Sequence, residues 1–148
     1  MADIRKSFQK AGLRHTRQRE AVFAALCATN AHPTAEELFE MVRECEPGLS
    51  LATVYNSLDA LTDARLCQRL PSNGGPIRYD ADLRQHVHLV LPDGRVLDVP
   101  DHLASQVLDS LPEGFADRLE ACCGIPVGSL GIQLVASEPI QTKPARDH

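Results

Sequence analysis

The sequence predicts an α+β protein, with an N-terminal winged helix-turn-helix domain followed by a small C-terminal α/β dimerisation domain. Three observations support this prediction. Helix-capping residues and apolar residues at helical spacing recur up to about residue 61, and two short β-rich runs around a turn-forming loop follow. After residue 80 a separate set of β-rich runs and helices begins. Helices followed by a hairpin in this order are typical of a winged helix.

Two helices are expected at the start of the chain. Residues 3–11 have apolar side chains on one side of a helix and end at Gly12, a residue type that commonly terminates helices. Thr16 can cap a second helix that runs to about Ala28, because its hydroxyl can accept a hydrogen bond from a backbone N–H of the first turn. Both helices present apolar residues to a common core.

Two further helices follow. Thr34 and Glu37 have the spacing of a capping box and open a third helix, which ends before Pro47-Gly48. Ser50 caps a fourth helix. Its apolar residues lie at helical spacing, and they are Leu51, Val54, Leu58 and Leu61.

A β-hairpin is expected after the helices and would form the wing. Residues 66–70 and 77–80 are predicted as its strands, and residues 71–76, which are rich in Pro and Gly, as its loop. Arg69 and Arg78 flank this loop, and we expect them to reach DNA phosphates.

The second half of the chain has a different pattern. The expected elements are strands at 86–91 and 95–99 around Pro92-Asp93-Gly94, helices at 101–111 and 113–123, and a final strand at 128–136. This half is too small to bury a sizeable core alone. We therefore expect it to complete its core by pairing with a second copy of the chain.

The net charge of −5 is unevenly distributed. The first nineteen residues are rich in Arg and Lys, whereas acidic residues gather between Glu36 and Glu46. A basic entry segment favours contact with nucleic acid despite the overall acidity. Because we find neither a signal peptide nor an apolar run long enough to cross a bilayer, we expect a cytoplasmic protein without membrane contact.

The cysteine pattern argues against a disulfide framework. There are five cysteines, an odd number, and none are spaced as Cys-x-x-Cys. We expect mostly buried free thiols. The adjacent pair Cys122-Cys123 leaves open a thiol sensor or a site for a soft metal.

Metal-competent side chains cluster between Asp80 and Asp98, around the pair His86-x-His88. Residues two apart on a strand face the same side, so both imidazoles can point at one ion. Taken alone, the pair has a structural or surface role as often as a metal-binding one. If Pro92-Asp93-Gly94 forms a three-residue hairpin loop, Asp98 lies opposite His88, whereas a two-residue loop would place Asp98 on the other face.

The fourth helix has the features of a DNA-reading helix. Its polar side presents Ser50, Thr53, Tyr55 and Asn56 near the N-terminus, the end that meets bases and phosphates in helix-turn-helix proteins. Asn can read adenine through two hydrogen bonds. An ordinary helix with small polar residues turned outward remains an alternative, because this helix has little positive charge.

Several motifs in the same order resemble the ferric uptake regulator (Fur) family. They are Gly12-Leu13-Arg14-x-Thr16-Arg17-Gln18-Arg19, Ala31-His32-Pro33-Thr34-Ala35-Glu36-Glu37-Leu38, Ser50-Leu51-Ala52-Thr53-Val54-Tyr55, Arg78-Tyr79-Asp80, His86-x-His88 and Gly94-Arg95-Val96-Leu97-Asp98. The resemblance spans roughly residues 8–136. It implies a dimeric, metal-responsive transcription regulator.

The resemblance also implies roles for DNA-contacting residues. Arg14 occupies the position of a basic residue that enters the minor groove, and Arg17 and Arg19 follow it in the same motif. Tyr55 occupies the main contact position of the recognition helix, but the next position is Asn56 where the family usually has Arg. An altered operator sequence and a weaker salt dependence of binding are therefore expected. Arg65 stands where the family commonly has Gly, which predicts a backbone conformation that suits glycine.

The resemblance implies one divalent metal per subunit, bound by His32, Asp80, His86, His88 and Asp98. This ligand set suits a borderline divalent ion, Fe(II), Mn(II) or Zn(II), and does not choose among them. Asp at the last position resembles the peroxide-sensing branch, and this resemblance favours Fe(II) or Mn(II) over Zn(II). The family's structural zinc site uses Cys-x-x-Cys where this chain has Leu91-Pro92-Asp93-Gly94, so we expect no Zn(Cys)4 site.

These inferences predict a metal-dependent repressor of metal-homeostasis or oxidative-stress genes, bound as a homodimer to an inverted repeat in double-stranded DNA. The expected domains are a winged-helix DNA-binding domain at 1–80, a hinge at 81–85, a dimerisation and metal-sensing domain at 86–138 and a flexible tail at 139–148. The alternative is a winged-helix regulator without a metal switch that responds to thiol oxidation or a small molecule. An enzyme with a two-His, one-carboxylate iron site is disfavoured, because the sheet layers around such a site are missing.

Overall fold

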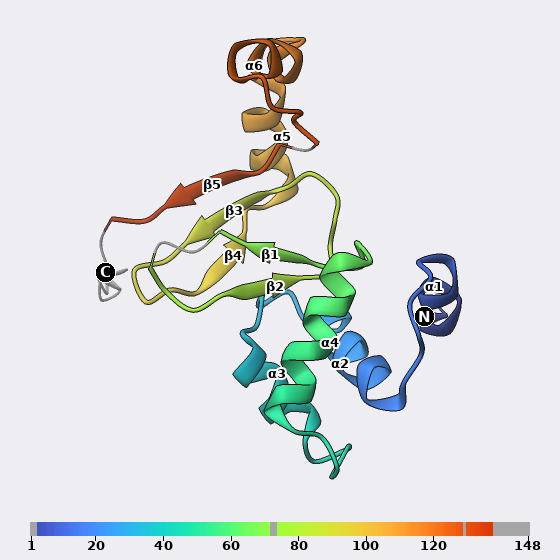
Figure 1. The fold of residues 1–148 in the computed structure, drawn as a ribbon. Helices are drawn as coiled ribbons and strands as arrows, with labels where there is room; N and C mark the ends of the chain where they lie inside the picture. The colour runs from blue at the N-terminus through green and yellow to red at the C-terminus, as the bar shows by residue number, and fades with distance from the viewer. Residues whose placement is uncertain (1–2, 72–73, 129, 138–148) are drawn as a thin grey trace, which may run out of the picture. The chain divides into compact units, whose positions relative to one another are not determined.

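The structure, a computed structural model, describes residues 3–71, 74–128 and 130–137. The chain divides into two compact units, Met1–Arg84 and Gln85–His148. Helices and small sheets together make up both units, which confirms the expected α+β class (Figure 1). The expected tail at 139–148 lies outside the described residues.

The first unit begins with the helices α1 (Ile4–Lys10), α2 (Arg17–Cys27), α3 (Ala35–Val42) and α4 (Leu51–Asp63). For α2, α3 and α4 a capping residue marks the start in the sequence. Thr16 accepts a hydrogen bond from the Arg19 N–H at the start of α2, and Ser50 accepts one from the Thr53 N–H at the start of α4. The capping box of α3 is also present, so the predicted helix starts are confirmed.

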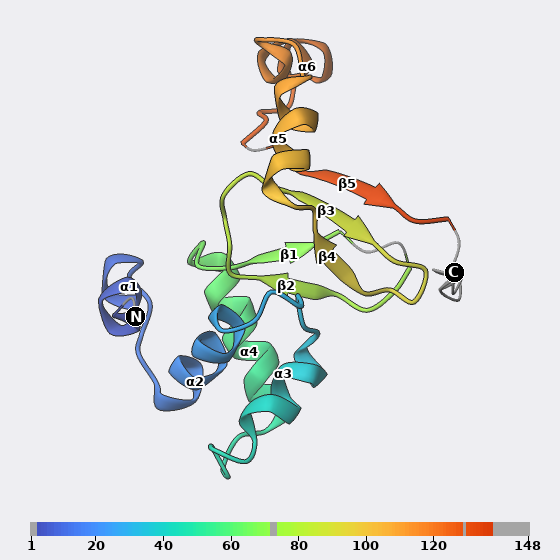
Figure 2. The ribbon, with the colours of Figure 1, turned by 180° about the vertical axis from the view of Figure 1, so that it is seen from behind.

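A single apolar core holds these helices together. Its fully buried members come from all the helices and include Phe8, Val22, Leu38 and Leu58. Figures 1 and 2 view the molecule from opposite sides, and both show α4 lying against α2 and α3. Burial of each large side chain contributes about 1.5–3 kcal/mol, so this core fixes the position of α4 within the unit.

The predicted hairpin is confirmed as β1 (Gln68–Leu70) and β2 (Arg78–Asp80), which pair antiparallel. All residues of β2 are buried. The Tyr79 N–H donates to the Pro33 carbonyl at 3.0 Å, so β2 is also attached to the segment that precedes α3. Residues 72–73 of the loop lie outside the described residues.

Arg65, which follows α4, has a φ of +55°. This φ confirms that the position has a conformation that suits glycine, since the left-handed region costs an ordinary residue about 1–2 kcal/mol and costs glycine little. Exchanging Arg65 for Gly is therefore expected to raise the free energy of unfolding by about 0.5–1 kcal/mol, after the greater chain entropy of glycine is subtracted. Thermal unfolding followed by circular dichroism measures the change. Ala64 has a negative φ, so Ala64→Gly is the control and should destabilise; a loss of stability in Arg65→Gly would contradict the strain.

The second unit contains a sheet with the order β4-β3-β5. Strand β3 (Val87–Val90) pairs antiparallel with β4 (Val96–Asp98) and parallel with β5 (Ile132–Val135). The helices α5 (Asp101–Asp109) and α6 (Phe115–Cys123) lie between β4 and β5 in the chain. They supply the long connection that a parallel strand requires, and both views show them beyond one end of the sheet (Figures 1 and 2).

The turn between β3 and β4 decides the register of the sheet. The Leu91 N–H donates to the Arg95 carbonyl at 2.8 Å, so the loop has three residues and His88 lies opposite Asp98. Gly94 has a φ of +84°, the left-handed conformation that this loop type needs at its last position. The alternative two-residue loop is excluded.

Much apolar surface of the second unit is exposed. Helix α6 has no buried residue, and α5 buries only Ala104. Among the described residues of this unit, the exposed large apolar ones are Leu97, Leu103, Phe115, Leu119, Ile125, Leu134 and Val135. The unit thus leaves apolar side chains uncovered, as expected for a small domain that pairs with another surface.

The expectation of mostly buried thiols was wrong. Cys67 is buried, whereas Cys27, Cys45, Cys122 and Cys123 are exposed. Position on a helix explains the difference for the adjacent pair, because α6 buries none of its side chains. Among the described helices, we find none with the length and apolar character needed to span a membrane.

Candidate metal centre and nucleic-acid interface

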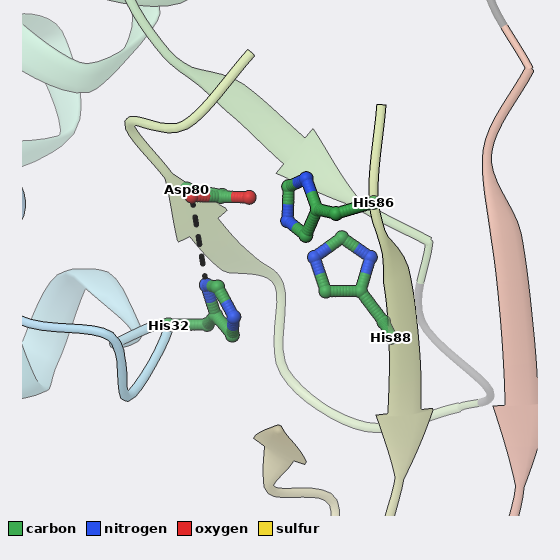
Figure 3. A group of neighbouring side chains, drawn as sticks. All are labelled: His32, Asp80, His86 and His88. Carbon is green, nitrogen blue, oxygen red and sulfur yellow. Dashed lines mark ion pairs between the residues drawn. The ribbon is translucent and has the colours of Figure 1, made fainter. Parts of the chain in front are cut away.

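The first half of the candidate metal site lies within the first unit. His32 Nδ1 and Asp80 Oδ1 are 3.7 Å apart, and both side chains are almost fully buried (Figure 3). The carboxylate is oriented by the chain that follows it, since Asp80 Oδ1 accepts a hydrogen bond from the Asp82 N–H at 2.8 Å. Gln68 Nε2 lies 3.4 Å from Asp80 Oδ2 and donates to the Asp82 carbonyl at 3.0 Å. The hairpin therefore places Asp80 in a defined orientation beside His32.

The backbone of His32 is unusual, with a φ of +48°. Residues with side chains seldom adopt this conformation, and it persists only where the surroundings hold it. Here Arg78 Nη1 donates to the His32 carbonyl and to Glu37 Oε2, both at 3.0 Å.

Arg78 is only 8% exposed, and this corrects the expectation that it contacts phosphate. Its place on the buried strand β2 turns the guanidinium toward the His32 segment rather than outward. The side chain of Arg69, by contrast, is exposed and bonds to Asp59 Oδ1 at 2.5 Å.

The second half of the candidate site lies within the second unit, where His88 is on β3, His86 directly precedes β3, and Asp98 is on β4. His86 Nε2 and His88 Nε2 lie 3.4 and 3.6 Å from Asp98 Oδ1. The two imidazole rings meet edge to face, with centroids 4.3 Å apart (Figure 3). Strand alternation and the three-residue loop bring these atoms to one place, because His88 is paired with Asp98 and His86 precedes it by two residues.

The donor spacing fits a divalent metal ion. Two ligand atoms that are each about 2.1 Å from a shared ion lie about 3.0–3.4 Å apart at tetrahedral or octahedral angles. The spacings in each half, 3.4 and 3.6 Å in one and 3.7 Å in the other, are close to this range. The residues that Figure 3 draws each offer one ligand atom of a suitable type. Imidazole and carboxylate together suit borderline ions such as Fe(II), Mn(II) and Zn(II).

Tyr55 on α4 is held by an acidic residue of α3. Its hydroxyl donates to Glu36 Oε1 at 2.6 Å, while the residue remains 40% exposed. This hydrogen bond to Glu36 raises the pKa of Tyr55, and it lowers the pKa of the Glu36 carboxyl. Tyr55 therefore stays a neutral phenol at physiological pH, with its hydroxyl held by Glu36 of α3.

The other predicted contact residues of α4 are also placed. Asn56 is exposed beside Tyr55. Ser50 and Thr53 are engaged with each other, since Ser50 Oγ accepts from the Thr53 N–H at 3.1 Å and lies 2.8 Å from Thr53 Oγ1. Ser50 thus serves as a cap with Thr53 hydrogen-bonded to it, and Asn56 has the more exposed side chain.

Some of the basic residues before and within α2 form hydrogen bonds with other groups of the protein. Arg14 is exposed, and its carbonyl accepts a hydrogen bond from Arg19 Nη1. Arg17 Nε donates to Glu46 Oε1 at 2.7 Å from a largely exposed side chain. Surface ion pairs of this kind contribute roughly 0–1 kcal/mol, so a phosphate can replace the carboxylate at little cost.

The sequence analysis missed the residues that support the site. Glu36 holds Tyr55, Gln68 lies beside Asp80, and Arg78 with Glu37 holds the His32 segment. Of these residues, only Glu37 is marked by a sequence motif, the capping box. Its other contact, with Arg78, is between residues 41 positions apart in the chain. No pattern within a few residues reports such a contact.

Comparisons with known protein families, sequences and structures agree on one protein family. The family model described as the ferric uptake regulator family matches residues 10–117. The peroxide-responsive repressor PerR of Staphylococcus epidermidis is 32% identical over 93 residues, which are 62% of this chain and 62% of that protein. The match thus spans about three fifths of that relative's length.

Solved structures with the same fold include ferric uptake regulators from two bacteria. The Vibrio cholerae protein has a TM-score of 0.68 at 25% identity, with 90% of this chain and 98% of that chain covered. The Pseudomonas aeruginosa protein, solved with manganese, has a TM-score of 0.67 at 25% identity, with 93% and 98% covered.

Proposed function

Because this chain belongs to the ferric uptake regulator family, we propose that it is a metal-dependent, DNA-binding transcriptional repressor of metal-homeostasis or oxidative-stress genes, and not an enzyme. The observation that carries the proposal is the convergence of His86, His88 and Asp98 on one point. The similarity to a peroxide-responsive repressor supports the class of genes.

We propose that one divalent ion takes ligands from both units. Each half-site is incomplete: His32 and Asp80 offer a nitrogen and an oxygen, and the second unit offers two nitrogens and an oxygen. Asp80 and His86 are six residues apart, so their backbones stay within about 20 Å even in a fully extended chain. A tether this short gives one half-site a high effective concentration at the other.

The ligand chemistry suits Fe(II), Mn(II) and Zn(II) alike, and we propose one ion of Fe(II) or Mn(II) per subunit, with Zn(II) as the further candidate. The manganese in the similar Pseudomonas aeruginosa structure supports this choice. No structural zinc is proposed, because the described cysteines do not pair at Cys-x-x-Cys spacing, and Leu91 and Gly94 stand where the family has those ligands.

The ion would act by joining the two units. A bound ion would hold His32, next to the helix-turn-helix, against the sheet that carries His86 and His88. If the ion fixes the two units relative to each other before DNA binds, less conformational entropy is lost on binding. The metal-bound form is therefore proposed to be the DNA-binding form. The coupling energy between metal and DNA sites in such systems is typically about 1–3 kcal/mol, or about 5–150-fold in affinity.

The proposed DNA interface is the exposed N-terminal part of α4 with the basic segment before and within α2 and the wing. Its residues are Arg14, Arg17, Arg19, Ser50, Thr53, Tyr55, Asn56 and Arg69. Tyr55 and Asn56 are exposed side by side on the helix that would enter the major groove. Arg69 is exposed on the hairpin, where it can reach phosphate.

A homodimer on an inverted repeat is proposed, with β5 at the interface. Strand β5 is an edge of its sheet, and Leu134 and Val135 on it are exposed. A symmetric pair of such edges would cover Leu134 and Val135. Two recognition helices would then read two half-sites.

The test of this function is DNA selection by the full chain from a random duplex library, with Mn(II) and with a chelator, followed by titration of the selected duplex. We expect a palindromic site whose affinity rises about 5–150-fold with Mn(II). Equal selection of all duplexes under both conditions would contradict the proposal.

A second candidate is a winged-helix regulator that senses thiol oxidation, and the exposure of Cys122 and Cys123 favours it. Cys67 is a poor sensor, because burial raises the pKa of its thiol. DNA binding that ignores chelator but responds to peroxide in metal-free protein, and loses this response in Cys122→Ser/Cys123→Ser, would support this candidate over the metal switch.

Glu36→Gln is expected to lower the pKa of Tyr55, because the carboxylate that accepts the phenol proton is replaced by a neutral amide. Ultraviolet titration of the phenols measures the change, because the chain has two tyrosines and no tryptophan. Removing a negative charge from the proposed interface should also raise affinity for random-sequence DNA, by about 2–10-fold at low salt. Glu40→Gln, on the same helix and paired with Arg43, is the control; an unchanged Tyr55 titration would contradict the role of Glu36.

A further inference from the structure

Arg78 connects three parts of the first unit. From β2, its Nη1 atom reaches the carbonyl of His32 and Oε2 of Glu37, each at 3.0 Å. The next residue of the strand donates its N–H to the Pro33 carbonyl at 3.0 Å. Asp80, one residue further, lies 3.7 Å from the imidazole of His32. Consecutive residues of one strand therefore contact the segment that carries His32.

This contact acts on a strained backbone. His32 is 3% exposed and has a φ of +48°, a conformation that crowds the Cβ atom and that residues with side chains seldom adopt. The left-handed turn directs the carbonyl of His32 toward the guanidinium, which holds it with a charge-assisted hydrogen bond. Without that bond, the backbone would relax toward an ordinary conformation, and the imidazole would move with it.

Glu37 links Arg78 to the first turn of α3. Its Oε2 atom accepts from Arg78 and also from the Thr34 N–H at 2.9 Å, while its own N–H donates to Thr34 Oγ1 at 3.2 Å. One carboxylate oxygen thus serves both the helix cap and the arginine. The position of His32 and the first turn of α3 are set by the same group.

We propose that Arg78 is a positioning residue of the metal site: it fixes His32 in the orientation that an ion requires, and through Glu37 it ties that orientation to the start of α3. This inference rests on the metal site of the proposed function. It assigns Arg78 a structural link between the metal ligand and the helix-turn-helix, in place of the phosphate contact that its position on the wing suggested.

The first experiment measures Mn(II) affinity of the full chain without DNA, from the electron paramagnetic resonance signal of free Mn(II). Arg78→Met is expected to weaken binding about 10–100-fold, the usual cost of losing a group that orients a ligand. Arg43→Met is the matched control, because Arg43 is exposed at the end of α3 and pairs with Glu40, and its affinity should equal that of the wild type. Unchanged affinity in Arg78→Met would overturn the proposal.

A double substitution tests whether Arg78 acts through His32. If it does, Arg78→Met should cost little further affinity in a His32→Asn background, since the two losses concern one ligand. Full additivity of the two losses would overturn the proposal. Should Arg78→Met fail to fold, Glu37→Gln replaces it: Gln can keep the helix cap but loses the charge opposite Arg78, and a smaller loss of affinity in the same direction is expected.

Two further measurements distinguish this role of Arg78 from a phosphate contact, and its failure from a failure of the proposed function. Hydrogen exchange at the Thr34 and Glu37 amides of metal-free protein should rise about tenfold in Arg78→Met, and unchanged exchange would overturn the link to α3 even if the wild type bound no Mn(II). Absence of Mn(II) binding in the wild type would overturn the proposed function itself. A phosphate-contact role would instead lower the slope of log affinity for DNA against log salt by about 1, with Mn(II) affinity intact, and that result would also overturn the inference.

Discussion

Substituting Asn for His32 is expected to abolish the response of DNA affinity to metal. The variant keeps Asp80, His86, His88 and Asp98, so Mn(II) can still bind, but about 10–100-fold more weakly and without a ligand from the segment before α3. Asn suits this position because it tolerates the left-handed backbone that His32 adopts at a φ of +48°. A change in stability is thereby kept small, and the loss reports on the ligand.

Fluorescence anisotropy of a labelled operator measures the effect. Wild-type affinity should rise about 5–150-fold on saturation with Mn(II), and the His32→Asn variant should change less than about twofold. His102→Asn is the control, since His102 is exposed on α5 and lies outside the proposed ligand set. A full metal response in His32→Asn would show that the ion regulates DNA binding without joining the two units.

Introducing proline at Val135 is expected to dissociate the homodimer. The Ala136 N–H donates to Val90 of β3, and because backbone groups alternate along a strand, the N–H of Val135 points to the outer edge of the sheet. Proline at this position removes a donor from the edge but none from the bonds to β3, and edge strands tolerate it. Val135 is 60% exposed, so little packing within the unit is lost.

Sedimentation velocity over a range of protein concentrations measures the dissociation constant. We expect it to rise at least about 100-fold, since both edges of a symmetric interface lose a hydrogen bond and an apolar side chain. Operator affinity should fall with it, because a monomer reads one half-site. Val135→Thr keeps the backbone N–H and should remain dimeric. A Val135→Pro dimer as tight as the wild type would place the interface elsewhere.

Local signals in the sequence identified the elements that depend on neighbouring residues. Thr16, Thr34 and Ser50 cap their helices as expected, because a cap joins atoms only two or three residues apart. The conformation of Arg65 was also foreseen from the type of residue that the position favours. The register of His88 opposite Asp98 was one of two options, and the conformation of Gly94 with the bond between Leu91 and Arg95 selected it.

The amino-acid sequence by itself determined the order of helices and strands, the caps, and the candidate ligands, because these depend on residue type and on spacing along the chain. Only the tertiary structure decided that Arg78 turns inward to His32, 46 residues away, that Glu36 holds Tyr55, and that α6 leaves its cysteines exposed. Such contacts depend on how the core of each unit brings distant segments together. A buried guanidinium and an exposed one look the same in a sequence, and they differ only in which carbonyl or carboxylate the fold places within hydrogen-bonding distance.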